Sequence, residues 1–209
     1  MEMQAITLGT YATNCYLLWG GAPGRALLID PADDGAALLR LLAQKDLQLE
    51  AILLTHGHYD HILAVPALQR HWPGLPVYCH PLDCPAETVE YDLGQAFPTV
   101  SAFAPLLPLA DGQHLTLAGL DIEVIATPGH TPGSVTFAVD GALFTGDTLF
   151  CGSVGRTDFA GGSAADLTKS LRRLAALPGD YAVWPGHEGP TTLARERRSN
   201  PYLNGRFSL

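Results

Sequence analysis

His56, His58, Asp60 and His61 fall within one short segment that directly follows the apolar run 51–54. Imidazole and carboxylate groups are the ligands that zinc and similar borderline cations prefer. A solvated loop whose histidines only cap the next helix explains this density poorly. The spacing predicts metal binding. Two adjacent metal sites fit it better than one, because His56 and His58 point the same way by period two while Asp60 and His61 sit where the chain turns.

Three later segments could supply the remaining ligands of such a centre. They contain His130, Asp147 and His187, and each comes directly after a predicted apolar strand. Taken alone, each of these Gly-containing segments is typical of a turn. Because all three follow strands, they occupy the positions where loops on a rigid scaffold carry functional side chains.

The elements that must position these residues alternate between hairpins and helices. Hydrophobic periodicity and turn residues predict strands at 4–8, 14–19, 26–30, 51–55, 115–117, 121–126, 134–139, 142–145 and 181–184. Helices are predicted at 34–45, from about His61, and at 163–176 behind a Ser163 cap. Hairpins separated by helices indicate two packed sheets with helices outside.

Length and composition limit the class of protein. The 209 residues are 47% hydrophobic and 16% charged, which predicts one folded domain over residues 1–209. Twelve basic against 21 acidic residues give a net charge of -9, which argues against nucleic acid or a membrane surface as partner. Neither a signal peptide nor a spanning helix is predicted, and we expect a cytoplasmic protein.

The four cysteines predict no disulfide framework. Cys15, Cys79, Cys84 and Cys151 are few and scattered. Cys79 and Cys84 also lack the spacing of a structural zinc site. We expect reduced thiols that serve as packing residues.

The order and intervals of HGHYDH, PGHTPGS, TGDTLF and PGH resemble the metallo-β-lactamase superfamily over most of the chain. The resemblance implies an α+β fold, a four-layer αββα sandwich with the metal site at the edge between the two sheets. It further implies two sets of metal ligands and one bridging carboxylate. One set is His56, His58 and His130, the other is Asp60, His61 and His187, and the bridge is Asp147.

Such a centre predicts metal-assisted hydrolysis. Two divalent cations favour an anionic transition state and supply a water nucleophile near neutral pH, so no nucleophilic serine or cysteine is needed. We assign catalytic roles to Asp60, which can orient that water, and to Asp147 as the bridge. Zinc is the first expectation, although iron or manganese can use the same ligands.

Within the superfamily, the segments 147–150 and 155–159, with Glu196 and the stretch 200–202, are most similar to short bacterial glyoxalase II, the hydroxyacylglutathione hydrolases. This likeness implies cleavage of an anionic thioester, S-lactoylglutathione, to lactate and glutathione. Arg156 would hold a glutathione carboxylate. The sequence departs from the family where Asp158 and Gly189 replace aromatic residues, and no glutathione-binding helical extension is recognised after His187.

Other activities remain open. The segment 155–159 also resembles persulfide dioxygenases, which would use one iron held by His56, His130 and Asp147 and consume oxygen. Lactonases and other hydrolases of the superfamily share the ligands, whereas a periplasmic β-lactamase should carry an export signal. A non-catalytic binding module is disfavoured because every ligand position is filled.

Overall fold

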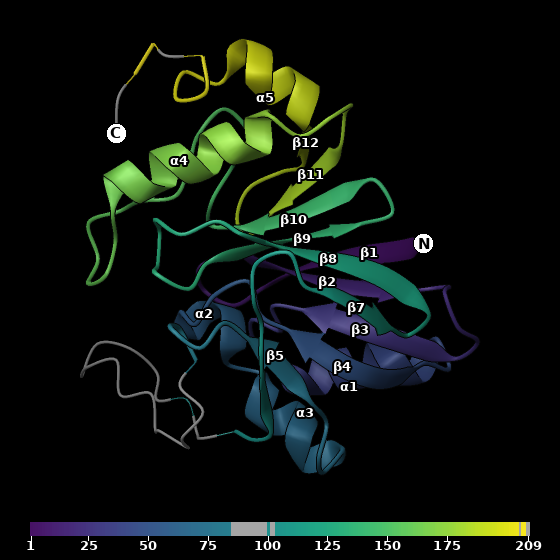
Figure 1. Cartoon of the computed structure of the whole chain (residues 1–209). Helices are drawn as coiled ribbons and strands as arrows, with labels where there is room; N and C mark the ends of the chain where they lie inside the picture. The colour runs from purple at the N-terminus through teal and green to yellow at the C-terminus, as the bar shows by residue number, and fades with distance from the viewer. Residues whose placement is uncertain (85–99, 101–102, 205, 208–209) are drawn as a thin grey trace.

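Two mixed β-sheets form the centre of the molecule (Figure 1). The computed structural model describes residues 1–84, 100, 103–204 and 206–207. In the first sheet the strand order is β1 (Glu2–Leu8), β2 (Thr13–Trp19), β3 (Arg25–Ile29), β4 (Gln48–Leu53), β5 (Val77–Cys79) and β6 (Leu106–Pro108). In the second it is β12 (Thr191–Thr192), β11 (Ala182–Pro185), β10 (Ala142–Gly146), β9 (Val135–Val139), β8 (Leu120–Ala126) and β7 (His114–Leu117).

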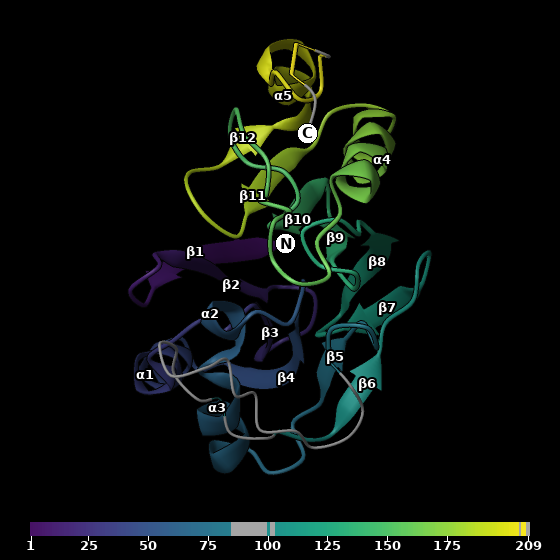
Figure 2. The same ribbon diagram turned by 90° about the vertical axis from the view of Figure 1, so that its left-hand side faces the viewer.

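Helices cover the outer face of each sheet (Figures 1 and 2). Next to the first sheet lie α1 (Gly35–Gln44), α2 (Tyr59–Ile62) and α3 (Val65–His71), and next to the second lie α4 (Ala164–Ala175) and α5 (Leu193–Ser199). The Ser163 hydroxyl accepts a hydrogen bond from the Asp166 amide and so caps α4 as predicted. The predicted four-layer αββα sandwich is confirmed.

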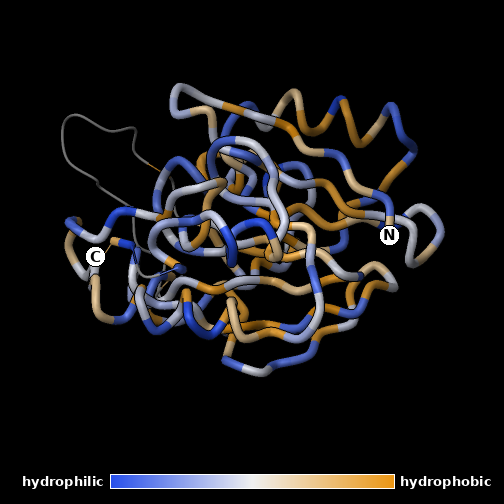
Figure 3. Tube along the Cα trace, turned by 90° about the horizontal axis from the view of Figure 1, so that it is seen from above, coloured by the Kyte–Doolittle hydropathy of each residue, from blue (hydrophilic) through white to orange (hydrophobic). Residues whose placement is uncertain are grey.

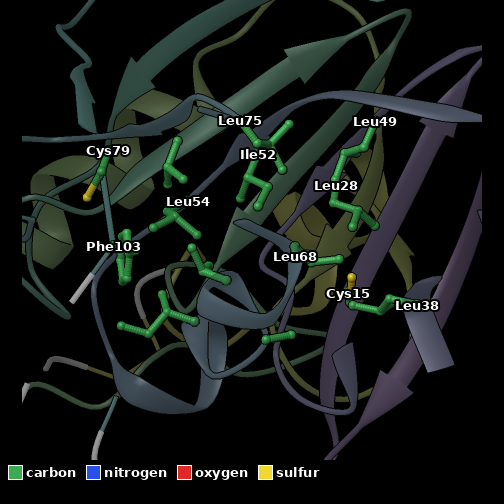
Figure 4. Packing of buried hydrophobic residues seen from close by; sticks show 14 of the residues in the cluster. Cys15, Leu28, Leu38, Leu49, Ile52, Leu54, Leu68, Leu75, Cys79 and Phe103 are labelled. Atoms are coloured by element: carbon green, nitrogen blue, oxygen red, sulfur yellow. The ribbon is translucent and has the colours of Figure 1, made fainter. Parts of the chain in front are cut away.

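Alternating side chains along the central strands divide the apolar residues into separate layers. In β2, Cys15 and Leu17 pack toward α1 and α3, whereas Tyr16 and Leu18 pack toward the second sheet. This is the period of two that a strand buried on both faces requires. Figure 4 shows residues of the layer between the first sheet and its helices α1 and α3. Figure 3 shows hydrophobic segments running through the interior, with hydrophilic ones on many of the loops.

A further apolar layer lies on the other side of the second sheet. Leu167, Leu171 and Leu174 of α4 pack with Leu143 and Val183 of that sheet. The helix buries one face because these leucines recur at three- and four-residue intervals. Both sheets are therefore held between two apolar layers, which gives the loops at their edges a rigid base.

One cysteine prediction is wrong. Cys79 and Cys84 form a disulfide, whereas Cys15 and Cys151 are free. The amides of Asp83 and Cys84 both donate to the His80 carbonyl, and this turn brings the two cysteine Cα atoms to 5.7 Å. That separation suits a disulfide, but the spacing in the sequence did not reveal the turn.

No helix in the described part of the chain is long and apolar enough to cross a membrane. The cytoplasmic location stays a prediction.

Candidate metal centre

Strand direction brings the candidate ligands to one edge of the sandwich. The parallel strands β3 and β4 end together, with Ile29 paired to Leu53, so Asp30 and the loop that carries His56 leave at the same edge. In the second sheet β8 and β10 both run antiparallel to β9, and β11 runs parallel to β10. Their carboxyl ends therefore share one edge, and the residues that follow them there are His130, Asp147 and His187.

The first group contains only histidines. The ligand atoms of His56, His58 and His130 all lie within 4.8 Å of one another. His58 Nδ1 is 3.1 Å from His56 Nε2 and 2.8 Å from His130 Nε2. Three ring nitrogens thus converge on one point, which is the arrangement that a tetrahedral metal ion with an open fourth position requires.

The second group combines two histidines with a carboxylate. The ligand atoms of Asp60, His61 and His187 also lie within 4.8 Å of one another. Asp60 Oδ2 is 3.6 Å from His61 Nε2 and 3.4 Å from His187 Nε2. The Thr13 hydroxyl donates to the same oxygen at 2.9 Å and helps to fix its direction.

Asp147 lies between the two groups. Its Oδ2 is 3.5 Å from His130 Nε2 and 3.4 Å from His187 Nε2, and its Oδ1 is 3.5 Å from His61 Nε2. One carboxylate thus faces ligands of both groups. The structure places all seven residues named from the sequence as ligands around a single centre.

Two polar atoms at this centre fit a bound cation. In the part of the chain that is described, His61 Nε2 and Asp147 Oδ1 are buried without a hydrogen-bond partner. An unpaired buried polar atom is costly, and one such atom in a native protein needs an explanation such as an ion. A divalent cation would satisfy both atoms, so the donor set fits a metal centre.

The outward-facing nitrogens of the histidines are held by neighbouring groups. His130 Nδ1 donates to the Arg156 carbonyl at 2.7 Å, and His187 Nδ1 donates to the Tyr11 carbonyl at 3.2 Å. Thr55 Oγ1 donates to Asp30 and is therefore free to accept from His56 Nδ1 at 3.1 Å. These bonds turn the opposite ring nitrogens toward the metal positions.

Sequence reasoning missed Asp30, which orients His61. Asp30 is 1% exposed, and its carboxylate accepts hydrogen bonds from the Thr55 amide at 2.8 Å, the Thr55 hydroxyl at 2.6 Å and His61 Nδ1 at 3.0 Å. Its ligand atoms also lie within 4.8 Å of those of His56 and His61. Because both oxygens already accept hydrogen bonds, we interpret Asp30 as an orienting group. An acidic residue directly after an apolar strand was the available signal.

The two groups differ in their electrostatics. Burial and the neighbouring histidine charges hold the pKa of His56 well below its ordinary value and lower the pKa of His58 to about 4. In the second group burial lowers the pKa of His61 and His187, but the negative charges of nearby carboxylates raise it by more. Asp147 and Asp30 raise the pKa of His61 to about 9, and Asp147 and Asp60 raise that of His187 to about 10.

These shifts predict different pH dependences of metal affinity. At pH 7 a cation must displace protons from His61 and His187, whereas His56 and His58 are already neutral. Because each displaced proton costs about tenfold in affinity for each pH unit of acidification, we expect the second site to weaken more steeply between pH 9 and pH 6. Chelator competition across this range measures the metal affinity of both sites. The same slope of affinity against pH at both sites would contradict the expectation.

A cavity adjoins the second group. It has a volume of about 450 Å³ and is lined by Asp60, Thr13, Tyr11, Tyr59, Leu8 and Leu63, among others. The rings of Tyr11 and Tyr59 meet edge to face with their centroids 5.6 Å apart. The cavity thus offers apolar walls beside a candidate catalytic carboxylate.

Arg156 lies beside the histidine group but is already paired. Its guanidinium donates to Asp158 at 2.6 and 2.7 Å and stacks 4.0 Å from the centroid of Phe159. The Phe159 ring in turn lies 5.7 Å from that of His58. Arg156 is therefore at the rim of the centre, and an anionic ligand would have to share it with Asp158.

The sequence pattern of the metallo-β-lactamase superfamily matches residues 8–187. The chain belongs to this superfamily, as its fold and motifs predicted. A relative named hydroxyacylglutathione hydrolase GloC, from Haemophilus influenzae, is 35% identical over 99% of this chain and 100% of its own length.

Solved structures agree with this assignment. The B3 metallo-β-lactamase BLEG-1 is 36% identical with a TM-score of 0.86, over 98% of this chain and all of its own. TTHA1623 in a di-iron-bound form is 41% identical with a TM-score of 0.83, over 96% and 100%. ETHE1 from Myxococcus xanthus is 31% identical with a TM-score of 0.80, over 98% and 85%.

Proposed function

We propose that this protein is a dinuclear metal-dependent hydrolase that cleaves a thioester such as S-lactoylglutathione into a hydroxy acid and glutathione. One observation carries the proposal. The Asp147 carboxylate reaches His130 of the first group and both histidines of the second at 3.4 to 3.5 Å. A carboxylate so placed suits two neighbouring cations. Zinc is our first choice, since imidazole and carboxylate ligands suit it.

The chain's own residues divide the work of hydrolysis. When bound, the two cations would supply a water nucleophile at neutral pH and polarise the thioester carbonyl. His56, His58 and His130 would hold one of them, and Asp60, His61 and His187 the other. The pKa of Asp60 is lowered, because its histidine and threonine partners outweigh the effect of burial. Asp60 is therefore ionised at neutral pH and can accept a hydrogen bond from the attacking water.

Features around the centre support a small thioester. The cavity beside Asp60 has room for a short acyl group, and its aromatic walls suit an apolar portion of the substrate. In this proposal Arg156 at the rim would bind the anionic thiol carrier and share its charge with Asp158. The similarity to GloC supports glutathione as that carrier.

Replacing Arg156 by alanine should raise KM about tenfold and lower kcat less, because the guanidinium would contact the carrier and not the reacting carbonyl. Steady-state kinetics on S-lactoylglutathione measure both constants. Arg198→Ala removes an exposed cation from α5 and serves as the matched control. An unchanged KM would remove Arg156 from the substrate site.

A persulfide dioxygenase with one iron is the second candidate. The likeness to ETHE1 supports this candidate. The di-iron form of TTHA1623 shows that a similar protein can hold iron, although it holds two ions and not one. His56, His130 and Asp147 would hold that iron. This reaction would consume oxygen, which hydrolysis does not.

Metal content per chain, measured on protein purified without chelators or a histidine tag, separates the two candidates. A value near two with S-lactoylglutathione cleavage supports the hydrolase. A value near one, all iron, with oxygen uptake on glutathione persulfide, would overturn it. Two metals without thioester cleavage would keep the dinuclear centre but redirect the substrate search to lactones and other esters.

A further inference from the structure

Asp83 belongs to neither group of candidate ligands, yet its carboxylate joins the loops that carry the histidine group. It is half-buried in the segment 79–84, next to the disulfide-bonded Cys84. One of these loops contains His56 and His58, and the other contains His130. A carboxylate between them can set the distance from one loop to the other.

Three hydrogen bonds make this connection. Asp83 Oδ2 accepts from the Gly57 amide at 3.2 Å and from the Thr131 hydroxyl at 2.5 Å. Asp83 Oδ1 accepts from the Gly133 amide at 2.7 Å. Gly57 lies between His56 and His58, and Thr131 directly follows His130. Every bond therefore ends within three residues of a histidine in the first group.

Glycines permit the close approach. A Cβ atom at Gly57 would lie 2.6 Å from the Asp83 carbonyl oxygen, and one at Gly133 would lie 2.5 Å from Asp83 Oδ1. Real Cβ atoms essentially never come this near to another heavy atom. Both loops are thus shaped to receive Asp83.

Each end of the connection is itself held in place. The Ser134 side chain accepts a hydrogen bond from the Thr131 amide at 3.2 Å and lies 2.6 Å from the Thr131 hydroxyl oxygen. On the other side, the Cys79–Cys84 disulfide and the turn at the His80 carbonyl restrain the backbone of Asp83. The backbone of Asp83 and the loop after His130 are therefore each held by bonds of their own.

The connection is specific to one metal position. In the described part of the chain the Asp83 carboxylate has no hydrogen bond to Asp60, His61 or His187. Those residues are oriented by Thr13, Asp30 and the Tyr11 carbonyl instead. Removal of the Asp83 carboxylate should therefore affect the two positions unequally.

We propose that Asp83 is a positioning residue that holds the loops of His56, His58 and His130 at the separation needed to bind one metal ion. The inference rests on the metal centre of the proposed function and does not depend on the substrate. Removing a group that orients metal ligands typically costs 10- to 100-fold in affinity.

The test is cobalt titration of the full chain after removal of bound metal. The d–d absorption of cobalt reports how each ion is coordinated, and competition with a chelator gives the two affinities. Asp83→Ala should weaken cobalt binding at the site of His56, His58 and His130 by about 10- to 100-fold. The affinity of the other site should change by no more than about threefold. Asp83→Asn keeps one acceptor oxygen and should give a smaller loss at the same site, so the test does not depend on the alanine variant folding.

Asp180→Ala is the matched control. Asp180 also accepts two backbone amides, from Tyr181 and Ala194, but lies at the opposite end of β11 from His187. Equal weakening of both sites, or unchanged affinities in both Asp83 variants, would overturn the inference. A wild-type chain that binds one ion would contradict the dinuclear hydrolase, while loss of affinity for that ion in Asp83→Ala would still support Asp83.

Discussion

Replacing Asp147 by alanine is expected to reduce kcat at least about a thousandfold, equivalent to about 4 kcal/mol of transition-state stabilisation. Asp147 faces His61, His130 and His187 at 3.4 to 3.5 Å. Asp30 also lies near ligands of both groups, but both of its oxygens already accept hydrogen bonds. Loss of Asp147 removes the one negative charge shared by two cations, so metal content should fall from about two ions per chain toward one or none.

Kinetics and elemental analysis of the same preparation test this expectation. Asp121→Ala is a suitable control, because Asp121 is an exposed carboxylate whose described side-chain bond is to Thr116 on the neighbouring strand. The control should keep full activity and full metal content. An Asp147→Ala variant that keeps both would remove the bridging role.

Replacing Asp30 by asparagine should destabilise the fold and weaken the second metal position. Three donors face this buried carboxylate, two from Thr55 and one from His61. An amide would turn its NH₂ group toward at least one of them. An unpaired buried polar group costs about 1–3 kcal/mol of unfolding free energy. The ring of His61 would also lose its orientation, at about 10- to 100-fold in metal affinity.

Urea unfolding of metal-free protein measures the first effect, and chelator competition measures the second. Asp34→Asn makes the same chemical change at the cap of α1, where asparagine serves as well as aspartate, and should be neutral. If Asp30→Asn matched Asp34→Asn in both measurements, Asp30 would have no orienting role.

Much of the architecture could be predicted from local patterns. The helix at Ala164–Ala175, its Ser163 cap and the strands of the second sheet from His114 to Pro185 follow from residue spacing that survives in the folded chain. Shorter elements were missed. The strands Leu106–Pro108 and Thr191–Thr192 are too short to show a hydrophobic period. They are recognised as strands only through their pairing with β5 and β11.

The sequence by itself determined the seven candidate ligands, because histidines and aspartates recur in short motifs directly after apolar strands. It also determined the alternation of hairpins and helices that places those motifs at one edge. Only the tertiary structure decided which carboxylates support the centre. Asp30 meets His61 across 31 positions, and Asp83 meets Gly133 across 50. Contacts between such distant segments depend on strand pairing and loop packing, which leave no periodic trace in the residues themselves.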